Sequence, residues 1–132
     1  MIGIVVVTHA NLASEFITTA EMIIGPAPRL QAVSIDRAIA LETAQQHLKQ
    51  ALAHVGQDGD GVIILTDMFG GTPTNISAEF LQEHRVEIIT GVNLPMLLKC
   101  VSARQGQTVN GLAALLKEYG SNAVMRPSEL LK

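Results

Sequence analysis

Two ionisable side chains follow apolar runs that have the composition of buried strands. The chain begins MIGIVVVTHAN, in which the apolar residues 4–7 lead into a threonine and then His9. Further along, the segment GVIILTDMFGGTPTN repeats this order and ends its apolar run with a threonine and Asp67. A carboxylate that accepts a hydrogen bond from one ring nitrogen of a histidine fixes the tautomer and leaves the other nitrogen free as a nucleophile. If the two strands are neighbours, the repeated pattern therefore predicts an activated histidine.

A histidine at the end of a strand can also be an inert, hydrogen-bonded structural residue. The segment after Asp67 favours chemistry, because it contains Gly70, Gly71 and Thr72 in the order GGTP. Adjacent glycines let backbone N–H groups approach an oxyanion, and the helix expected to begin at Pro73 adds unpaired donors. Taken alone, GGTP is equally well explained as a turn and a helix cap. The motif lacks the lysine of an ATP-binding phosphate loop, which argues against that class of site.

Two large apolar side chains, Met68 and Phe69, lie in the same loop. They can fold into the core, or they can form an exposed patch that docks a partner protein. The sequence leaves both interpretations open.

Alternating strands and helices must carry these residues to one place. Apolar runs rich in β-branched residues predict strands at 2–7, 30–35, 62–66 and 86–90. Apolar residues at helical spacing predict helices at 11–24, 39–55, 73–83, 96–103 and 109–119. This order predicts an α/β fold, with a doubly wound, mostly parallel sheet of four strands and helices on both faces. In such sheets ligands collect at the carboxyl ends of the strands, where His9 and Asp67 fall.

Several local features refine this prediction. Asn11 and Thr72 have side chains typical of helix N-caps, and Thr72 precedes Pro73, which suits a first helical position. The segment NAVM at 122–125 is a candidate for a short last strand. Cys100 is the only cysteine, so no internal disulfide can form, and its apolar surroundings predict a buried core residue.

Composition limits the classes of function. A chain of 132 residues fits one domain, spanning 1–132, and 48% hydrophobic with 16% charged residues is typical of a folded core. The formal net charge is -3 and no basic block occurs, which argues against non-specific nucleic-acid binding. The N-terminus lacks the basic region of a signal sequence, and no window approaches the ~20 apolar residues of a membrane span. We therefore expect a soluble, cytoplasmic protein.

The spacing of the remaining histidines predicts no metal site. His47 and His54 are seven residues apart on one predicted helix, which separates them by roughly 10 Å. That distance is too long for one ion, and no cluster of residues has metal-ligand spacing. We expect no resident cofactor.

The residues quoted above, together with two further stretches, carry a resemblance to a known family. The chain resembles the IIA subunits of mannose-type sugar phosphotransferase systems over essentially its whole length. The resemblance rests on the segments GIVVVTHAN, TAEMIIG, LTDMFGGTPTN and ITGVNLPML. It implies a phosphocarrier that takes a phosphoryl group from the phosphohistidine of HPr and passes it to a histidine of a IIB subunit. Sugar would then be phosphorylated on import through the membrane subunits IIC and IID.

The resemblance also implies roles for particular residues. His9 would be phosphorylated, Asp67 would orient it, and Gly70, Gly71 and Thr72 would face the phosphoryl oxygens. A phosphohistidine donor is already activated, so neither nucleotide nor metal would be required. Members of the family are dimers that exchange their terminal strand, for which the segment 122–125 is the candidate here.

Ala10 departs from the family pattern, which usually has glycine directly after the active histidine. If the position needs a positive φ, alanine costs on the order of 1 kcal/mol. If the glycine only allows close approach, the alanine methyl would crowd a docking partner. The sequence does not decide between these explanations.

Other functions stay open at this point. The phosphorylation state could be sensed by a regulatory partner in an incomplete system, or the chain could resemble the phosphotransfer subunit of dihydroxyacetone kinase. A different class is a non-catalytic module that holds a small anion through GGTP, for which His9→Ala would leave function intact. A receiver module phosphorylated on Asp67 would need an acidic pair after the first strand, where this chain has Thr8 and His9. The sugar cannot be named, because sugar contacts in these systems belong to other subunits.

Overall fold

The computed structural model describes residues 1–131 and contains one parallel sheet of four strands. The sheet order is β2-β1-β3-β4, and all three strand pairings are parallel. The strands are β1 (Gly3–His9), β2 (Leu30–Ile35), β3 (Val62–Thr66) and β4 (Val86–Ile89). The helices are α1 (Leu12–Ile24), α2 (Leu41–Val55), α3 (Gly71–Ala78), α4 (Leu94–Ala103), α5 (Val109–Asn122) and α6 (Pro127–Leu130). The predicted α/β fold with a four-stranded parallel sheet is confirmed.

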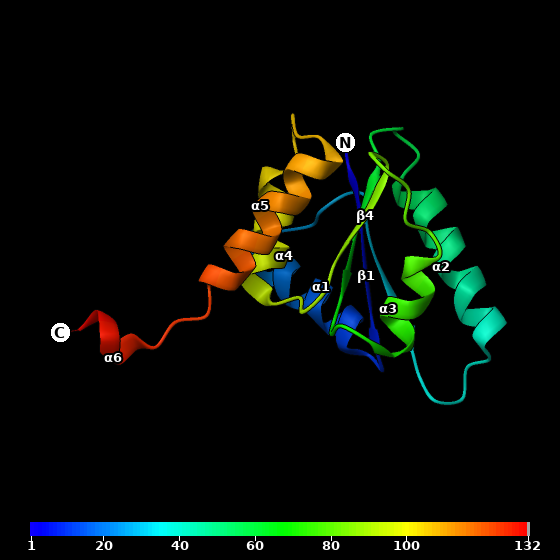
Figure 1. Cartoon of the computed structure of the whole chain (residues 1–132), viewed down its shortest axis with the longest axis horizontal. Helices are drawn as coiled ribbons and strands as arrows, with labels where there is room; N and C mark the ends of the chain where they lie inside the picture. Colours follow the sequence, from blue (N-terminus) through cyan, green and yellow to red (C-terminus); the bar gives the residue numbers. More distant parts are fainter. Residues whose placement is uncertain (132) are drawn as a thin grey trace.

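The helices cover both faces of the sheet. Figure 1 shows α1, α4 and α5 on one side of the strands, with α2 and α3 on the other. Alternate residues of the central strand β1 belong to two cores. Ile4 and Val6 lie in the first core, between the sheet and α1, α4 and α5, and Val5 and Val7 lie in the second core, between the sheet and α2 and α3. A strand buried on both faces needs a continuous apolar run, which explains the sequence IVVV.

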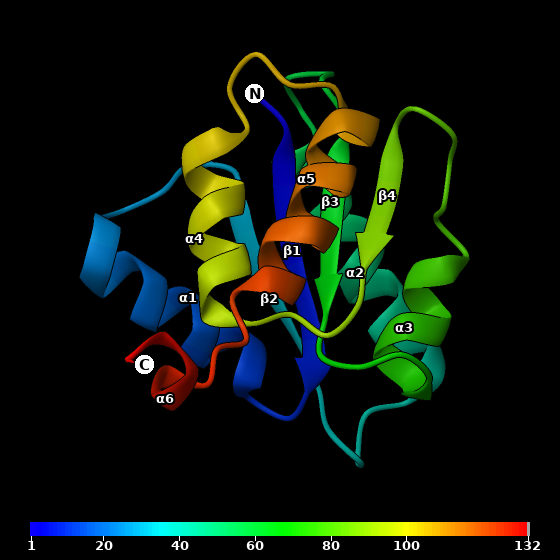
Figure 2. The same ribbon diagram turned by 60° about the vertical axis from the view of Figure 1, so that its left-hand side comes forward.

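The direction of winding changes between β1 and β3. The connection through α1 leads from β1 to β2, whereas the connection through α3 leads from β3 to β4 on the opposite side of the sheet. Figure 2 shows the neighbouring arrows of β1 and β3 ending at the same edge. The loops that follow these two strands therefore diverge, and their divergence leaves room for a ligand site.

Two helix starts differ from the prediction. Asn11 makes no side-chain capping bond on α1, and the N–H of Ala13 instead donates to Thr8 Oγ1 over 2.7 Å. The third helix begins at Gly71, so Thr72 is a helical residue rather than the cap. Both expected caps were polar residues that directly precede a predicted helix in the sequence. The path of the backbone decides which side chain reaches an N–H group of the first turn.

The third helix is also shorter than the predicted span of 73–83. It ends at Ala78, after which the N–H of Phe80 bonds to the carbonyl of Ser77 and the side chain of Phe80 packs on the second core. The chain then turns through His84, which has a φ of 65°, and enters β4. Packing of Phe80 and this reversal end the helix early.

The segment 122–125 forms no strand within the single chain. Asn122 ends α5, and the following residues extend to the short helix α6, which stands away from the rest of the chain in Figure 1. A strand needs a neighbouring strand for its hydrogen bonds, and within residues 1–131 this segment has none. The expected exchange between two copies stays a prediction.

Cys100 lies in the first core, as expected, and is fully buried. Burial raises the pKa of its thiol to about 12, so it is an inert core residue. Among the helices of residues 1–131, none is both long enough and apolar enough to cross a membrane.

Candidate functional site

His9 and Asp67 meet at the carboxyl edge of the sheet. The ring nitrogen Nδ1 of His9 lies 2.8 Å from Asp67 Oδ2, and the backbone N–H of His9 donates to the same oxygen over 2.9 Å. Because an ionised carboxylate only accepts hydrogen bonds, Nδ1 carries the ring proton and Nε2 keeps its lone pair. The geometry thus leaves Nε2 as the ring atom that is able to act as a nucleophile.

The strand register explains why these two residues meet. Strands β1 and β3 are hydrogen-bonded neighbours, and Val7 pairs with Thr66. Asp67 follows its strand by one residue, and His9 lies two residues beyond Val7, so both side chains emerge at one point of the rim. The condition set for an activated histidine, that the two strands are neighbours, is therefore met.

Asp67 is placed to remain ionised beside the ring. Its side chain is 13% exposed, whereas that of His9 is 49% exposed. Partial burial opposes ionisation, but the hydrogen bonds from the His9 backbone and ring outweigh it and hold the pKa of Asp67 below its ordinary value. The second oxygen, Oδ1, is buried and has no hydrogen-bond partner in the described part of the chain. The carboxylate therefore keeps its negative charge close to the histidine.

The two glycines bring the start of α3 against the histidine ring. Gly70 and Gly71 have φ angles of 82° and 81°, which favour glycine. A Cβ added to Gly71 would lie 3.0 Å from Cε1 and 3.2 Å from Nε2 of His9. The first amides of a helix have no partner inside it, and these include Gly71 and Thr72 in α3. Nε2 thus faces a helix start that has free donors and a dipole suited to an anion.

Two buried threonines fix the loops that carry the pair. Thr8 Oγ1 accepts the Ala13 N–H at the start of α1, and Thr66 Oγ1 accepts the hydroxyl of Thr74 in α3 over 2.8 Å. The Thr74 hydroxyl also lies 2.6 Å from the carbonyl oxygen of Met68. Each threonine in the repeated motif therefore ties a strand end to the next helix, a role that the sequence pattern alone did not reveal.

The remaining predicted site residues lie around the same rim. Met68 is 53% exposed and Phe69 is 84% exposed, so the side chains project from the molecule instead of entering the core. The Thr72 side chain is exposed and makes no hydrogen bond within residues 1–131. Since its hydroxyl is not used as a cap, it is available to a ligand near Nε2.

A hollow of about 540 Å³ opens beside the histidine. Its lining residues are His9, Ala10, Ile35, Asp36, Arg37 and Thr72. Sequence reasoning did not single out Arg37. Its position directly after a predicted strand, at the edge where ligands collect, was the signal that could have identified it.

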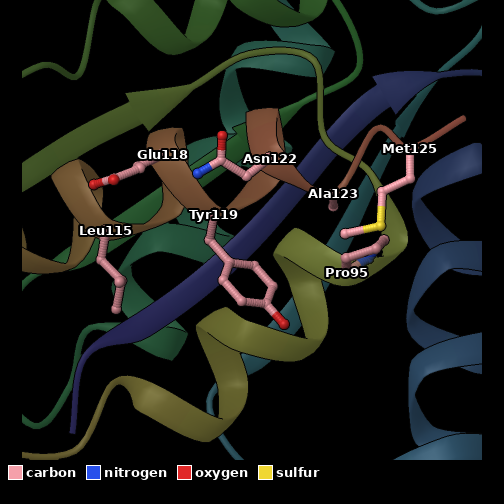
Figure 3. A pocket seen from close by; sticks show the side chains of 7 residues that line it. All are labelled: Pro95, Leu115, Glu118, Tyr119, Asn122, Ala123 and Met125. Atoms are coloured by element: carbon pink, nitrogen blue, oxygen red, sulfur yellow. The ribbon is translucent and has the colours of Figure 1, made fainter. Parts of the chain in front are cut away.

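A second hollow of about 580 Å³ lies away from this pair, where α5 and the following segment meet α4. Figure 3 shows the Tyr119 ring directed toward α4 and Met125 beside Pro95. The Lys99 ammonium lies 5.0 Å from the centre of the Tyr119 ring. The lining of this hollow is mostly apolar and does not include His9 or Asp67.

The described residues contain no group of three or more histidine, cysteine or acidic side chains arranged to hold a metal ion. By itself, the His9–Asp67 pair could supply two ligands, fewer than such a group needs. The chemistry that this arrangement can perform is nucleophilic attack by Nε2 on an electrophile whose negative oxygens face α3.

Comparison with known proteins identifies the family of the chain. Residues 3–117 match the family model described as "PTS system fructose IIA component". The chain is 32% identical to the PTS system fructose-specific EIIA component of Bacillus subtilis, with 100% of this chain and 90% of the relative covered. It belongs to the fructose and mannose family of phosphotransferase system IIA components.

Other relatives agree with the family assignment. The mannose-specific EIIAB component of Escherichia coli is 32% identical over 93% of this chain, although the match covers only 38% of that longer protein. The crystal structure of phosphotransferase system component EIIA from Streptococcus agalactiae has the same fold, with a TM-score of 0.87, 22% identity, and 98% of this chain and 99% of that chain covered. Membership implies a phosphotransferase component in general terms.

The structure also explains the unusual Ala10 of this IIA component. Ala10 has a φ of 50°, in the left-handed region that glycine adopts more easily. Its N–H donates to the carbonyl of Ile35 over 2.8 Å, which holds the backbone in this conformation. The first of the two explanations, a position that needs positive φ, therefore applies.

Proposed function

We propose that the chain is a phosphocarrier that accepts a phosphoryl group from phospho-HPr on Nε2 of His9 and passes it to a histidine of a IIB subunit. The observation that carries the proposal is the 2.8 Å contact between His9 Nδ1 and Asp67 Oδ2, which leaves Nε2 free beside the start of α3. Family membership supports the same reaction class. Through IIB, the phosphoryl group would serve sugar import by the membrane subunits IIC and IID.

The transfer step is a displacement at phosphorus. The Nε2 lone pair forms the new N–P bond, and the bond to the donor's ring nitrogen breaks with its electron pair returning to that ring. Asp67 holds the His9 tautomer and stabilises the positive charge that develops on its ring. The phosphoryl oxygens would accept hydrogen bonds from the amides of Gly71 and Thr72 and from the Thr72 hydroxyl. Gly70 would contribute through the loop conformation that its positive φ allows.

The exposed loop side chains fit the docking of a partner protein. The opposite reactant is a histidine on another protein, so the nucleophile has to lie near the surface, as His9 does. Met68 and Phe69 project beside it and offer apolar area at the edge of the site. We propose that they contact HPr and IIB in turn, that the chain acts as a single IIA domain and that it works in the cytoplasm.

Labelling tests this function directly. The protein is incubated with enzyme I, HPr and labelled phosphoenolpyruvate, and we expect acid-labile phosphate on His9. His9→Ala should lose the label, whereas His47→Ala, which removes an exposed histidine of α2, should retain it. An unlabelled wild-type protein contradicts the proposal, and alkali-labile phosphate on Asp67 would indicate a receiver module instead. Chase of the label onto added IIB tests the second half of the transfer.

We also propose a homodimer that exchanges its C-terminal segment. Val124, Met125 and Leu131 are exposed apolar side chains on the segment that stands away from the chain in Figure 1, and β4 forms an open edge of the sheet. Sedimentation of wild type and of Val124→Asp tests this arrangement. The wild-type protein should sediment as a dimer and the variant as a monomer, whereas a wild-type monomer contradicts the exchange.

A further inference from the structure

Arg37 lies beside the proposed nucleophile because of the pairing between β1 and β2. In that register, His9 is opposite Ile35, and the N–H of Ala10 bonds to the carbonyl of Ile35. Arg37 follows two residues later and lines the same hollow as His9 and Thr72. The strand pairing thus delivers a basic side chain to the site from the side opposite Asp67.

The loop that carries Arg37 is anchored around it. Asp36 Oδ1 accepts the N–H of Ala38 over 2.8 Å and that of Ile39 over 3.0 Å, and Ile39 packs against the second core. The Arg37 side chain is exposed, and no ion pair or hydrogen bond in the described part of the chain engages its guanidinium. Its backbone is therefore held in place while its five N–H donors remain unused.

Within residues 1–131, the loops that form the rim of the site carry one full positive charge of this kind. Four loops follow the strands, at 10–11, 36–40, 67–70 and 90–93, and Arg37 is the only lysine or arginine among them. A phosphoryl group on Nε2 would bring negative charge close to Asp67, which is itself ionised. The amides of α3 are only dipoles, so one cation remains available to balance this charge.

We propose that Arg37 binds the phosphoryl group carried on Nε2 of His9 through hydrogen bonds from its guanidinium to the phosphoryl oxygens. The inference rests on the proposed function and adds a residue to it. A guanidinium stays protonated and presents parallel donors that match phosphate oxygens. In the displacement at phosphorus described above, Arg37 transfers no proton. It stabilises charge on the oxygens while one N–P bond forms and the other breaks.

A contact between Arg37 and the phosphoryl group would change the pKa of that group, whereas a contact between Arg37 and a partner protein would not. A cation beside a phosphoryl group favours the dianion over the monoanion and so lowers the pKa of that group. Removing the cation should raise that pKa, irrespective of which donor supplied the phosphoryl group. Titration of the ³¹P signal of the phosphorylated protein measures this quantity without a partner present.

The experiment compares wild type, Arg37→Gln, Arg37→Lys and Arg85→Gln. Arg85 is an exposed arginine at the opposite end of the sheet, just before β4, and serves as the matched control. Each protein is phosphorylated with phospho-HPr and, separately, with phosphoramidate as a small donor. We expect Arg37→Gln to slow labelling from both donors by on the order of 10- to 100-fold. We also expect its ³¹P titration midpoint to rise by about one pH unit, with Arg37→Lys intermediate and Arg85→Gln unchanged.

The outcomes separate this inference from the proposed function. If neither donor labels His9 of the wild-type protein, the phosphocarrier function fails and this inference fails with it. If the wild type is labelled but Arg37→Gln matches it in rate and ³¹P midpoint, only the role of Arg37 is overturned. A slower reaction with phospho-HPr alone, at an unchanged midpoint, also overturns it, because Arg37 would then contact the partner and not the phosphoryl group.

Discussion

Two arginines at opposite ends of the sheet, Arg104 and Arg37, differ in their contacts. At the amino end, Arg104 is 2% exposed. Its guanidinium donates to the carbonyls of Ile2, Pro28 and Arg29 over 3.1, 2.6 and 3.3 Å. At the carboxyl end, Arg37 is exposed and its donors are unengaged within residues 1–131. The first arginine is committed to the fold, whereas the second remains available to something outside it.

Other side chains at the two ends also differ. The N-terminal ammonium at the amino end pairs with Asp58 and Asp60, and Arg29 pairs with Asp58 over 3.1 Å. At the carboxyl end, His9 is half exposed and Phe69 projects from the surface. The amino end therefore holds these charged groups in ion pairs within the chain, whereas the carboxyl end presents exposed side chains at the surface. Mutations at the two ends should therefore affect different measurements.

The largest expected effect is on stability, from Arg104→Met. The variant removes the guanidinium donors from three carbonyls, although that of Arg29 still accepts the N–H of Ile4 over 2.9 Å. We therefore expect the free energy of unfolding to fall by about 3 kcal/mol. Urea denaturation measures this, with Arg37→Gln as the matched control from the other end, expected to change stability by less than about 0.5 kcal/mol. The folded fraction of Arg104→Met should still be phosphorylated at the wild-type rate. Equal stability losses in the two variants would break the comparison.

The next effect is on rate, from Asp67→Asn. An amide beside Nδ1 can donate to it, which would move the ring proton to Nε2 and remove the nucleophilic lone pair. We expect transfer from phospho-HPr to slow on the order of 100-fold, equivalent to about 2.7 kcal/mol of activation free energy. Asp60→Asn makes the same change at the amino end and should leave the rate unaltered. A comparable loss in Asp60→Asn would contradict the division between the ends.

A smaller effect is expected at Ala10. Glycine adopts a φ of 50° more easily than alanine, so Ala10→Gly should raise the free energy of unfolding by about 1 kcal/mol. Ala38→Gly, in the neighbouring loop, is the control and should lower stability because it only loosens the unfolded chain. Thermal denaturation of both variants checks the difference in sign. A loss of stability in Ala10→Gly would show that the left-handed backbone is not strained.

The smallest effect is expected in acid. The pKa of Asp67 is lower in the folded chain than in the unfolded chain, so its ionised form stabilises the fold above the unfolded pKa of about 4. That contribution is lost as the pH falls through the lower, folded pKa. Between pH 5 and pH 3, wild type should therefore lose more stability than Asp67→Asn. Unfolding curves that run parallel for the two proteins would show that the carboxylate adds no stability through ionisation.

The four strands and the edge of the sheet that carries His9 and Asp67 could be predicted because they depend on short-range signals. Apolar runs identified the four strands, and the general rule for open sheets put His9 and Asp67 at one edge. The contact between Nδ1 and Oδ2 then follows from strand adjacency, which the sequence suggested and the parallel pairing of β1 with β3 supplies.

What escaped prediction depends on long-range geometry. Thr8 instead of Asn11 accepts the first-turn amide of α1, and Thr72 is not a cap, because backbone direction decides which hydroxyl reaches an N–H. Within the described part of the chain, the segment 122–125 has no strand beside it, so its local composition could not settle its conformation. Arg37 was missed because an isolated arginine has no motif, and only pairing with β1 brings it to the histidine.

One oxygen of Asp67 receives both the backbone N–H and the ring nitrogen of His9. The same acceptor therefore clamps the imidazole to its own main chain, and the ring cannot swing to another rotamer without giving up one of the two bonds. After one partner leaves and before the next binds, the ring therefore keeps the rotamer in which Nε2 is free. The protein can then react with a donor and an acceptor in succession through one orientation of the His9 ring.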